Sequence, residues 1–537
     1  MEGRGGGHSF IKDEEISSMS FMINSKLEDD EDPEVSKRLP INPDSEDIFF
    51  NMADGLLLIK LLNLVDENAV DMRTINKYTN NMNAVAIKIN VNQALTAAKG
   101  FLKLVGVNDT AFTNQNKGII LGVLIQLARL LAVKDIDLAH CAELYRLKYE
   151  DEEMEDFNKL KPEDILIRWV NHHLKEAGQE RRIKNLGKDI ADGEAMTYVL
   201  HQLDKSPSNE NEERLNRTTL EPLSEEDLVK RNNMMIEESK KIGVKEVCQG
   251  KDLVKGNAKV NTIFVAEVFN TRHGLTITEE ERAEVEKFGN DYDDGEGNAE
   301  ERAFRLWINS LGIEDVFIEK SLYDECNDGV YLLKVCHRIK DGSVDWKKVV
   351  GEDPMFGQKK KTEKMGPFDH KINTQLAFEA CENVIGKKQH GIGGDDIFKT
   401  NKKLMLALIW QLARYHALAL LGSKEEKDIL AWANEKAGSV CQIKSFSDSG
   451  LQSGRFLIKL CEAIDHEVID WDIVTAGEDD EGKEANAKYA ISLARKFGAF
   501  IFCVWEDVVN SKKKMMLVLI SGIYDCYLNK HERKIEE

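Results

Sequence analysis

The sequence is poor in proline and has no apolar run long enough to cross a membrane. Only 8 of its 537 residues are proline, which favours long helices because proline interrupts them. The longest apolar stretch, residues 118–133, contains Gln126 and Arg129 and is shorter than the roughly 20 residues that span a bilayer. We therefore interpret it as a buried core helix and expect no membrane insertion.

Targeting signals and paired cysteines are also missing. No apolar segment opens the chain, and Glu2 follows Met1, so neither a secretory signal peptide nor an N-myristoylation signal is visible. The 9 cysteines are scattered and form no C-x-x-C pair of the kind that binds zinc or cycles as a redox dithiol. We expect a cytoplasmic protein with reduced, mostly buried cysteines and no metal.

The chain has a large surplus of negative charge. Its formal net charge is −22, whereas a nucleic-acid binder needs an excess of Lys and Arg to neutralise phosphates. We therefore expect no nucleic-acid partner. An acidic protein can still bind an acidic partner, but only through local basic patches and apolar contacts.

The common catalytic signatures are absent. The sequence has neither H-E-x-x-H nor G-x-S-x-G, and residues 243–251 have the wrong glycine spacing for a phosphate-binding loop. His172 and His173 are adjacent on an expected helix and point in different directions, which makes them a poor metal pair. We expect no enzyme activity and no cofactor.

One sequence pattern occurs four times. A short turn ends in glycine and leads directly into an amphipathic helix, as in D-G-L-L-L-I-K-L-L at residues 54–62. The four glycines, Gly55, Gly193, Gly329 and Gly454, lie 138, 136 and 125 residues apart. Solenoid repeats are about 20 to 50 residues long, whereas intervals above about 100 residues let each copy form its own core. The sequence therefore predicts four duplicated domains.

A second pattern follows each glycine turn. A capping-type residue, Asn116, Asn257, Asn401 or Ser511, precedes a long apolar helix, and lysine stands near its start in every copy. Lysine in the first turn opposes the helix dipole, at a cost of a few tenths up to about 1 kcal/mol. Solvation of long side chains would explain any single case. Four parallel cases favour a contact surface.

A third pattern separates the copies into two types. Trp169, Trp307 and Trp432 occupy matching helical positions, which we interpret as core, and Met22 takes that place in the first copy. The last helices of copies one and three contain Q-L-A-R, at residues 126–129 and 411–414, and the other two do not. This order predicts a two-domain module that was itself duplicated.

These segments together resemble the fimbrin family, also called plastins. The resemblance runs from about Ser20 to Leu528, and its main segments are KPEDILIRW at 161–169, GNAKVN at 256–261, EERAFRLWINSLG at 300–312, GIGG at 391–394 and NAKYAIS at 486–492. It implies an all-α chain of four calponin-homology helical domains, arranged as two tandem pairs in a compact monomer.

The resemblance also implies domain boundaries. We expect a flexible N-terminus at 1–15, calponin-homology domains at 16–140, 158–275, 299–422 and 423–530, and an acidic inter-module linker at 276–298. Many family members have calcium-binding EF-hands ahead of the first domain, and we expect none here. Residues 290–301 resemble an EF-hand loop, but Tyr292 and Gly297 replace residues that such a loop needs, so we expect no calcium site.

The function that the resemblance implies is the cross-linking of actin filaments into tight bundles. Each tandem pair would bind the side of one filament of F-actin, so that one molecule joins two filaments. In the first module the implied contacts are Met22, Ile23, Asn24, Lys26, Asn116, Lys117, Gly118, Ile119 and Ile120. In the second module they are Arg305, Asn309, Asn401, Lys402, Lys403 and Leu404, and Trp307 at the same helix is interpreted as packing.

One alternative remains open. The chain could be a calponin-homology scaffold whose first half binds actin while its second half binds another partner, such as a microtubule or a signalling protein. Apolar final helices with basic starts in both halves favour the cross-linker. The acidic run at residues 28–32 would repel an acidic filament, so we expect it to point away.

Overall fold

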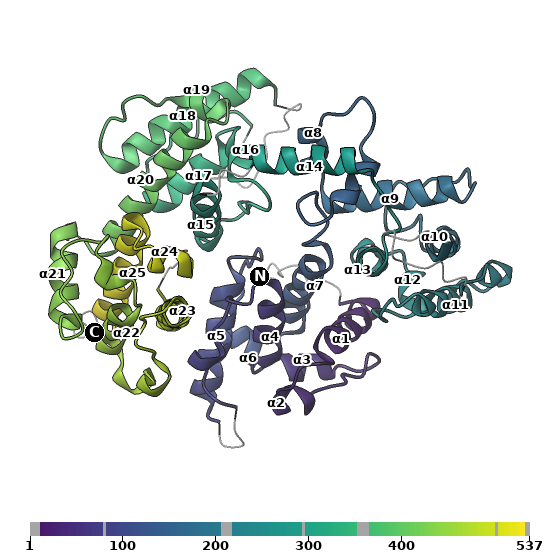
Figure 1. Ribbon diagram of the computed structural model, residues 1–537, viewed down its shortest axis with the longest axis horizontal. Coiled ribbons are helices and arrows are strands. Elements are labelled where there is room, and N and C mark those ends of the chain that lie inside the picture. Colours follow the sequence, from purple (N-terminus) through teal and green to yellow (C-terminus); the bar gives the residue numbers. More distant parts are fainter. Residues whose placement is uncertain are drawn as a thin grey trace, which may run out of the picture. The chain divides into compact units, whose positions relative to one another are not determined.

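The computed structural model describes residues 11–78, 82–205, 217–292, 296–351, 365–422, 424–499 and 503–531 (Figure 1). All regular elements within these ranges are α- or 3-10 helices, which confirms the predicted all-α class. None of the described helices is long and apolar enough to cross a membrane.

The helices follow one order in four successive repeats. The first repeat contains α1 (Asp13–Leu27), α2 (Pro33–Ser36), α3 (Asp47–Met52), α4 (Leu56–Val65), η1 (Met72–Thr74), α5 (Ala84–Ala98), α6 (Asp109–Thr113) and α7 (Lys117–Val133). The second contains η2 (Ala142–Leu147), α8 (Met154–Asn158), α9 (Pro162–Glu176), α10 (Glu194–Lys205), η3 (Glu221–Ser224), α11 (Leu228–Lys241), α12 (Gly250–Leu253) and α13 (Ala258–Thr271).

The other two repeats use the same plan after an intervening helix, α14 (Glu279–Tyr292). The third contains α15 (Glu296–Ser310), α16 (Leu322–Cys326), α17 (Val330–Ile339), α18 (Pro367–Ile385), α19 (Gly394–Phe398) and α20 (Lys402–Leu420). The fourth contains α21 (Glu426–Ala437), η4 (Ser449–Leu451), α22 (Arg455–Ile464), η5 (His466–Val468), η6 (Trp471–Ile473), α23 (Asp480–Lys496), α24 (Trp505–Val509) and α25 (Lys513–His531).

The repeated glycine is required by the backbone. Gly55, Gly193, Gly329 and Gly454 have φ values of 85°, 75°, 81° and 72°, a left-handed conformation that glycine adopts without penalty. Each stands immediately before α4, α10, α17 or α22, as the sequence predicted. A Cβ atom at Gly329 would lie only 2.7 Å from the backbone of Asn373, so a side chain has no room there.

A buried asparagine lies against the turns at Gly193, Gly329 and Gly454, and Asn90 directly precedes Val91, the residue that lies against Gly55. Asn90, Asn232, Asn373 and Asn486 are 0–1% exposed. Asn373 shows the role, because its Nδ2 donates to Val350 O and its Oδ1 accepts from Val350 N, both at 2.9 Å. Two bonds from one amide hold a loop that has no regular partner of its own. The sequence analysis did not identify this position.

The chain separates into two compact units. Of the described residues, the first unit comprises those within 1–69, 78–91 and 107–294, and the second comprises those within 70–77, 92–106 and 295–537. In the second unit, one continuous apolar core extends from Ala303 to Leu528 through both the third and fourth repeats. Since repeats three and four share one core, the pair is a structural entity, in agreement with the predicted two-domain module.

Within the first unit, α1 lies between the two repeats. It packs on α4 and α7 of the first repeat and on α12 and α13 of the second. Met19, Met22 and Ile23 are 0–1% exposed. Helix α1 begins at Asp13, so part of the predicted flexible N-terminus is helical, while residues 1–10 lie outside the described part of the chain.

The tryptophan positions are core, as predicted. Trp169 and Trp307 are 0% exposed, Trp432 is 6% exposed, and Met22 fills the matching place in the first repeat. Trp432 also stacks on Tyr524 with ring centroids 4.2 Å apart. Aromatic rings that bury such large apolar areas stabilise each repeat.

The predicted acidic linker contains a docked helix. α14 packs on η2, the first helix of the second repeat. Arg282 Nη2 on α14 lies 2.5 Å from Glu143 Oε1, and Tyr145 Oη donates to Glu284 Oε2 at 2.9 Å. Residues 293–295, and with them part of the EF-hand-like segment, are outside the described residues. The acidic composition suggested a simple connector because it does not reveal these partners.

Candidate functional site

The starts of the last helices α7 and α20 have the same local geometry. Asn116 caps α7 by accepting a hydrogen bond from Ile119 N at 3.2 Å, and Asn401 caps α20 by accepting from Leu404 N at 3.4 Å. The preceding residues, Gln115 and Thr400, have φ values of 56° and 53°. Gly256 before α13 and Ser511 before α25 have similar φ values, 66° and 48°, so this left-handed residue is a feature that all four repeats share.

The fourth repeat departs from the predicted cap. Asn257 accepts from Lys259 N at 3.2 Å and caps α13, as expected. Ser511 does not cap α25, because its φ is 48°, its Oγ donates to Asp448 O at 3.0 Å, and the helix begins at Lys513. The prediction for Ser511 was therefore wrong: its hydroxyl is used by a loop 63 residues away in sequence.

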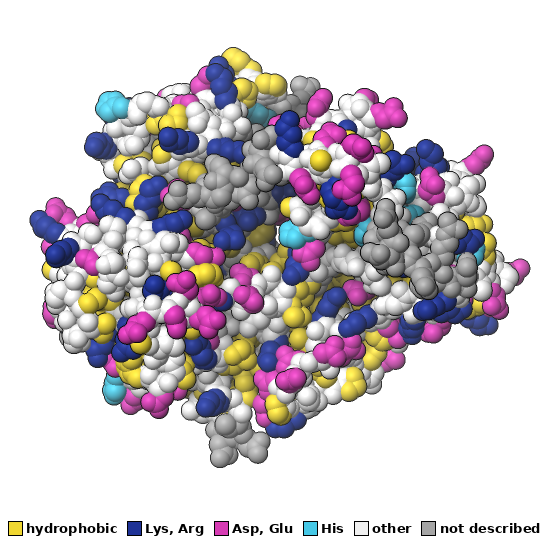
Figure 2. All heavy atoms as spheres, viewed as in Figure 1, with side chains coloured by type: hydrophobic (Ala, Val, Ile, Leu, Met, Phe, Trp, Pro, Cys, Tyr) yellow, Lys and Arg dark blue, Asp and Glu magenta, His cyan; other side chains and the backbone are white. Residues whose placement is uncertain are grey.

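Most of the residues predicted at these helix starts are accessible. Asn116, Lys117 and Gly118 are exposed and Ile119 is half-buried, whereas Ile120 is fully buried. In the second unit Asn401, Lys402 and Lys403 are exposed and Leu404 is half-buried. Figure 2 shows Lys and Arg side chains interspersed with apolar ones over α18 and α20. The two starts thus offer similar basic surfaces with apolar neighbours.

Lys117 and Lys402 at these helix starts each lie near an aromatic ring. Lys117 Nζ lies 2.5 Å from Glu46 Oε2 and 5.9 Å from the centre of the Phe49 ring. Lys402 Nζ lies 5.7 Å from the centre of the Tyr323 ring. Both lysines therefore lie near the ring of an aromatic residue, which limits where their charges can be presented.

The predicted contacts on the opening helices α1 and α15 are less accessible than those at the starts of α7 and α20. Met22 and Ile23 on α1 are buried, and Lys26 Nζ forms an ion pair with Glu267 Oε2 of the second repeat at 2.9 Å. On α15, Arg305 Nη1 donates to Glu319 O at 2.9 Å. These side chains face the interior or a neighbouring segment, so in this conformation they offer little surface to a partner.

An asparagine of each opening helix holds a loop. Asn309 Nδ2 donates to Ile318 O at 3.0 Å, and its Oδ1 accepts from Ile318 N at 2.8 Å. The same pair of bonds joins Asn24 to Ile41, Asn171 to Ile183 and Asn434 to Ile443, at 2.7–2.9 Å. Because all four repeats share the arrangement, Asn24 and Asn309 have a structural role here.

The Q-L-A-R signature joins the two repeats of each unit. Arg129 on α7 donates from Nε and Nη2 to the carboxylate of Glu163 on α9. Burial disfavours the charged form of Glu163, yet Arg129 outweighs it and lowers the pKa of this carboxyl. Arg414 binds Glu426 on α21 in the same way. The signature marks repeats one and three because only they precede a partner repeat.

A second repeated contact lies at the start of the opening helices. Glu15 Oε1 is 3.8 Å from Lys259 Nζ, and Glu300 Oε1 is 3.0 Å from Lys514 Nζ. The lysines at the starts of α13 and α25 therefore contact the opening helix of the preceding repeat. Lys259 is nevertheless exposed, and Lys117 pairs with Glu46 at 2.5 Å, so ion pairing alone does not decide which of these helix starts contacts a partner.

Comparison with known proteins supports this architecture. The family described as "Calponin homology (CH) domain" matches residues 23–132, 160–274, 298–418 and 423–529. The chain is 34% identical to Fimbrin-5 of Arabidopsis thaliana over 96% of this chain and 73% of that protein. It is 34% identical to Fimbrin of Saccharomyces cerevisiae over 96% and 78%, respectively, and 32% identical to human Plastin-3 over 100% and 82%.

A solved structure matches nearly the whole chain. It is the crystal structure of the actin-crosslinking core of Schizosaccharomyces pombe fimbrin, with a TM-score of 0.76 and 30% sequence identity. The match covers 96% of this chain and 99% of that one. Four matched domains, full-length relatives and this structure agree, and the chain therefore belongs to the fimbrin/plastin family of proteins with four calponin-homology domains.

Proposed function

We propose that this protein binds actin filaments and cross-links them into bundles, with each pair of repeats binding the side of one filament. The observation that carries the proposal is the duplicated surface at the starts of α7 and α20, one in each unit. Two binding sites on one chain can engage two filaments, whereas one site can only decorate a single filament. The S. pombe relative whose structure matches is an actin-crosslinking core.

The accessible residues define the proposed contacts. In the first unit they are Asn116, Lys117, Gly118 and Ile119, and in the second Asn401, Lys402, Lys403 and Leu404. Of the remaining predicted contacts, Met22, Ile23, Ile120 and Asn309 are buried and would meet a filament only if the repeats of a unit rearranged. Asn24, Lys26 and Arg305 are half-buried and already bind other parts of the chain. The proposed surfaces do not depend on such a rearrangement.

Charge supports these surfaces as the points of attachment. The protein has a net charge of −22, and an actin filament is also acidic, so the two repel each other over most of their surfaces. Lysines at the starts of α7 and α20 supply local positive charge where both helices are exposed. We propose that the protein acts in this way as a monomer, in the cytoplasmic actin cytoskeleton, without enzymatic activity.

Sedimentation of the full-length chain with actin filaments tests the proposal. Bundles pellet at low speed, whereas decorated single filaments pellet only at high speed. We expect the wild-type chain to bring actin into the low-speed pellet. Binding at high speed without any low-speed pellet would instead support the scaffold whose second unit has another partner.

A charge-reversal variant tests the second surface directly. Lys402→Glu with Lys403→Glu should abolish the low-speed pellet and leave high-speed binding through the first unit. Lys347→Glu with Lys348→Glu is a matched control, since both of these lysines are exposed on the same unit outside the proposed surface. Loss of bundling in the control, or full bundling by the first variant, would reject this assignment.

A further inference from the structure

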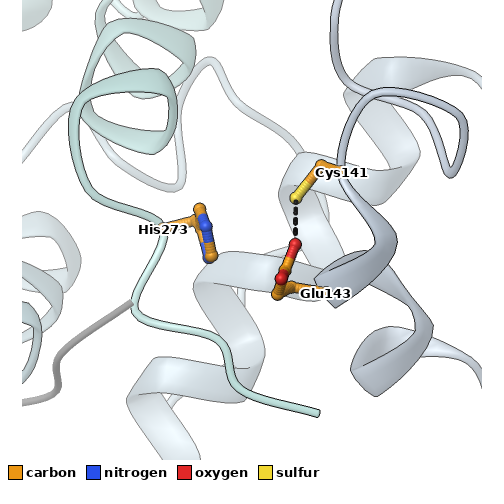
Figure 3. Close-up of side chains that lie close together, drawn as sticks. All are labelled: Cys141, Glu143 and His273. Atoms are coloured by element: carbon orange, nitrogen blue, oxygen red, sulfur yellow. Dashed lines mark hydrogen bonds between the residues drawn. The ribbon is translucent and has the colours of Figure 1, made fainter. Parts of the chain in front are cut away.

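We propose that Cys141, Glu143 and His273 form a binding site for one divalent ion of the zinc type. The three residues each offer a ligand atom, and these atoms lie within 4.8 Å of one another. Cys141 Sγ is 3.6 Å from Glu143 Oε2. Figure 3 shows His273 close to the other two side chains, although it comes from a segment 130 residues further along the chain.

The surroundings fix these side chains in place. The carbonyl oxygen of His273 accepts hydrogen bonds from Trp169 Nε1 and His173 Nε2, both at 2.8 Å. Trp169 and His173 are 0–1% exposed, so they anchor His273 to the core of the second repeat. His273 is thus positioned by outer contacts, and a ligand held in this way needs little reorganisation to bind a metal. Arg282 pairs with Oε1 of Glu143 and competes for this carboxylate, while Oε2 faces the Cys141 thiol.

The chemistry of the donors selects the metal. Thiolate, imidazole and carboxylate are the ligands of zinc, while calcium and magnesium prefer oxygen alone. Bonds of about 2.0 to 2.3 Å place ligand atoms roughly 3 to 4 Å apart around a tetrahedral ion. The observed spacing therefore requires only small side-chain rotations. Three protein ligands leave the fourth position to water.

Metal binding would replace one proton. Burial and the nearby Glu143 carboxylate raise the pKa of the Cys141 thiol to about 12, so the free protein holds a neutral thiol that donates to Glu143. The ion takes the place of this proton, which is released to solvent. Leu275 N donates to His273 Nδ1 at 3.1 Å, and the neutral ring gives up this bond if it binds the ion through Nδ1.

The location suggests what an ion would do. Cys141 and Glu143 lie in the segment that enters the second repeat, and His273 follows α13, the last helix of that repeat. One ion would join the entry and the exit of the repeat. It would also act on α14, because Arg282 shares the Glu143 carboxylate. The sequence analysis predicted no metal because it relied on cysteine pairs, and ligands this far apart in sequence give no such signal.

Cobalt provides a direct probe of the site. The reduced, metal-free full-length protein is titrated with Co²⁺, and thiolate-to-cobalt charge-transfer absorption is recorded. We expect one equivalent to bind and zinc to displace it. Cys141→Ser should lack the absorption, whereas Cys441→Ser, which also replaces a half-buried cysteine, should retain it. Absence of the band, or its survival in Cys141→Ser, would overturn the proposal.

The Arg282→Gln variant is expected to raise the affinity for zinc, whereas damage to the structure would lower it. Arg282→Gln removes the cation that competes for Glu143, so we expect it to bind zinc several-fold more tightly than the wild type. Damage to the site would weaken binding instead. Unchanged or weaker binding would show that Glu143 is not a ligand and would overturn the assignment. Neither measurement involves actin, so failure here leaves the proposed bundling function standing.

Discussion

Arg414 on α20 donates two hydrogen bonds to Glu426 Oε1 at the start of α21, at 2.9 Å from Nε and 2.7 Å from Nη2. The same relationship joins Arg129 to Glu163 in the first unit. The Q-L-A-R sequence, which served to distinguish two types of repeat, thus provides the arginine of a contact between two repeats. It orients the second repeat of each unit on the last helix of the first.

The energetic contribution of this pair should be modest. Arg414 and Glu426 are 39% and 33% exposed, and exposed pairs contribute about 0.2 to 1 kcal/mol because solvent screens them. We expect a double-mutant cycle with Arg414→Met and Glu426→Gln to give a coupling free energy in that range. Urea unfolding of the four proteins measures it. A coupling above about 2 kcal/mol would mean that the pair behaves as a buried one.

The asparagine of the opening helix should matter more for stability. Asn309 is 6% exposed and both of its polar groups bind Ile318, so Asn309→Ala leaves a buried N–H and C=O without partners. Such a loss costs about 1 to 3 kcal/mol for each group. Asn510→Ala is the control, because Asn510 is exposed and donates only to Glu506 O. We expect a clear drop in melting temperature for Asn309→Ala alone, and equal effects would contradict the structural role.

Structural features that depend on residues close together in the sequence were predicted, and those that depend on distant residues were not. The glycine turns, the caps at Asn116 and Asn401 and the tryptophan core were predicted because each depends on residues close together in the chain. The buried asparagines opposite the glycines were not predicted. Their partners are backbone groups of a distant loop, and the residues that follow them, such as Val91, Thr374 and Ala487, share no pattern.

The candidate site was predicted only in part, for a related reason. Lysines at the starts of all four last helices favoured a contact surface. Lys259 and Lys514 pair with glutamates of the opening helices, whereas Lys117 pairs with Glu46 of its own repeat. Pairing between repeats depends on how the domains pack. A one-dimensional pattern cannot reveal which copy of a motif a neighbouring domain will cover.

A buried carboxyl predicts an unusual dependence on pH. Asp507 is 2% exposed, and burial raises its pKa above the ordinary 3.8, although Val504 N and the charges of Lys512 and Arg302 oppose the shift. With the higher pKa in the folded state, the folded chain binds more protons than the unfolded one. The contribution of Asp507 to stability therefore falls as pH rises from about 3.8 through the raised folded value.

Substitution of Asp507 by asparagine should remove the loss of stability that ionisation of this carboxyl causes as pH rises. The amide still accepts the bond from Val504 N but carries no charge, so Asp507→Asn should gain stability relative to the wild type on going from pH 4 to pH 7. Melting temperatures of both proteins at the two pH values measure the change. Asp480→Asn, at a fully exposed side chain, is the control. A relative loss at pH 7 would show that the charge stabilises the fold.

The glycine turns give a matched pair of substitutions. Gly329 and Gly342 have φ values of 81° and 74°, so alanine is strained at both, by about 1 to 2 kcal/mol. Only at Gly329 would the new Cβ also meet the Asn373 backbone at 2.7 Å, whereas nothing lies within 4 Å at Gly342. We expect Gly329→Ala to lower the melting temperature of the second unit far more than Gly342→Ala. Equal losses would mean that the turn can move away from α18.

Bundling should require both proposed actin-binding surfaces, whereas binding to single filaments should require only one. Lys117→Glu reverses the charge at the start of α7, and Lys402→Glu with Lys403→Glu does so at α20. Each variant alone should abolish bundling while still binding single filaments through the intact unit, because the units carry separate surfaces. The triple variant should lose at least tenfold in filament affinity at high speed. If Lys117→Glu still bundled filaments like the wild type, the first surface would have to lie elsewhere on its unit.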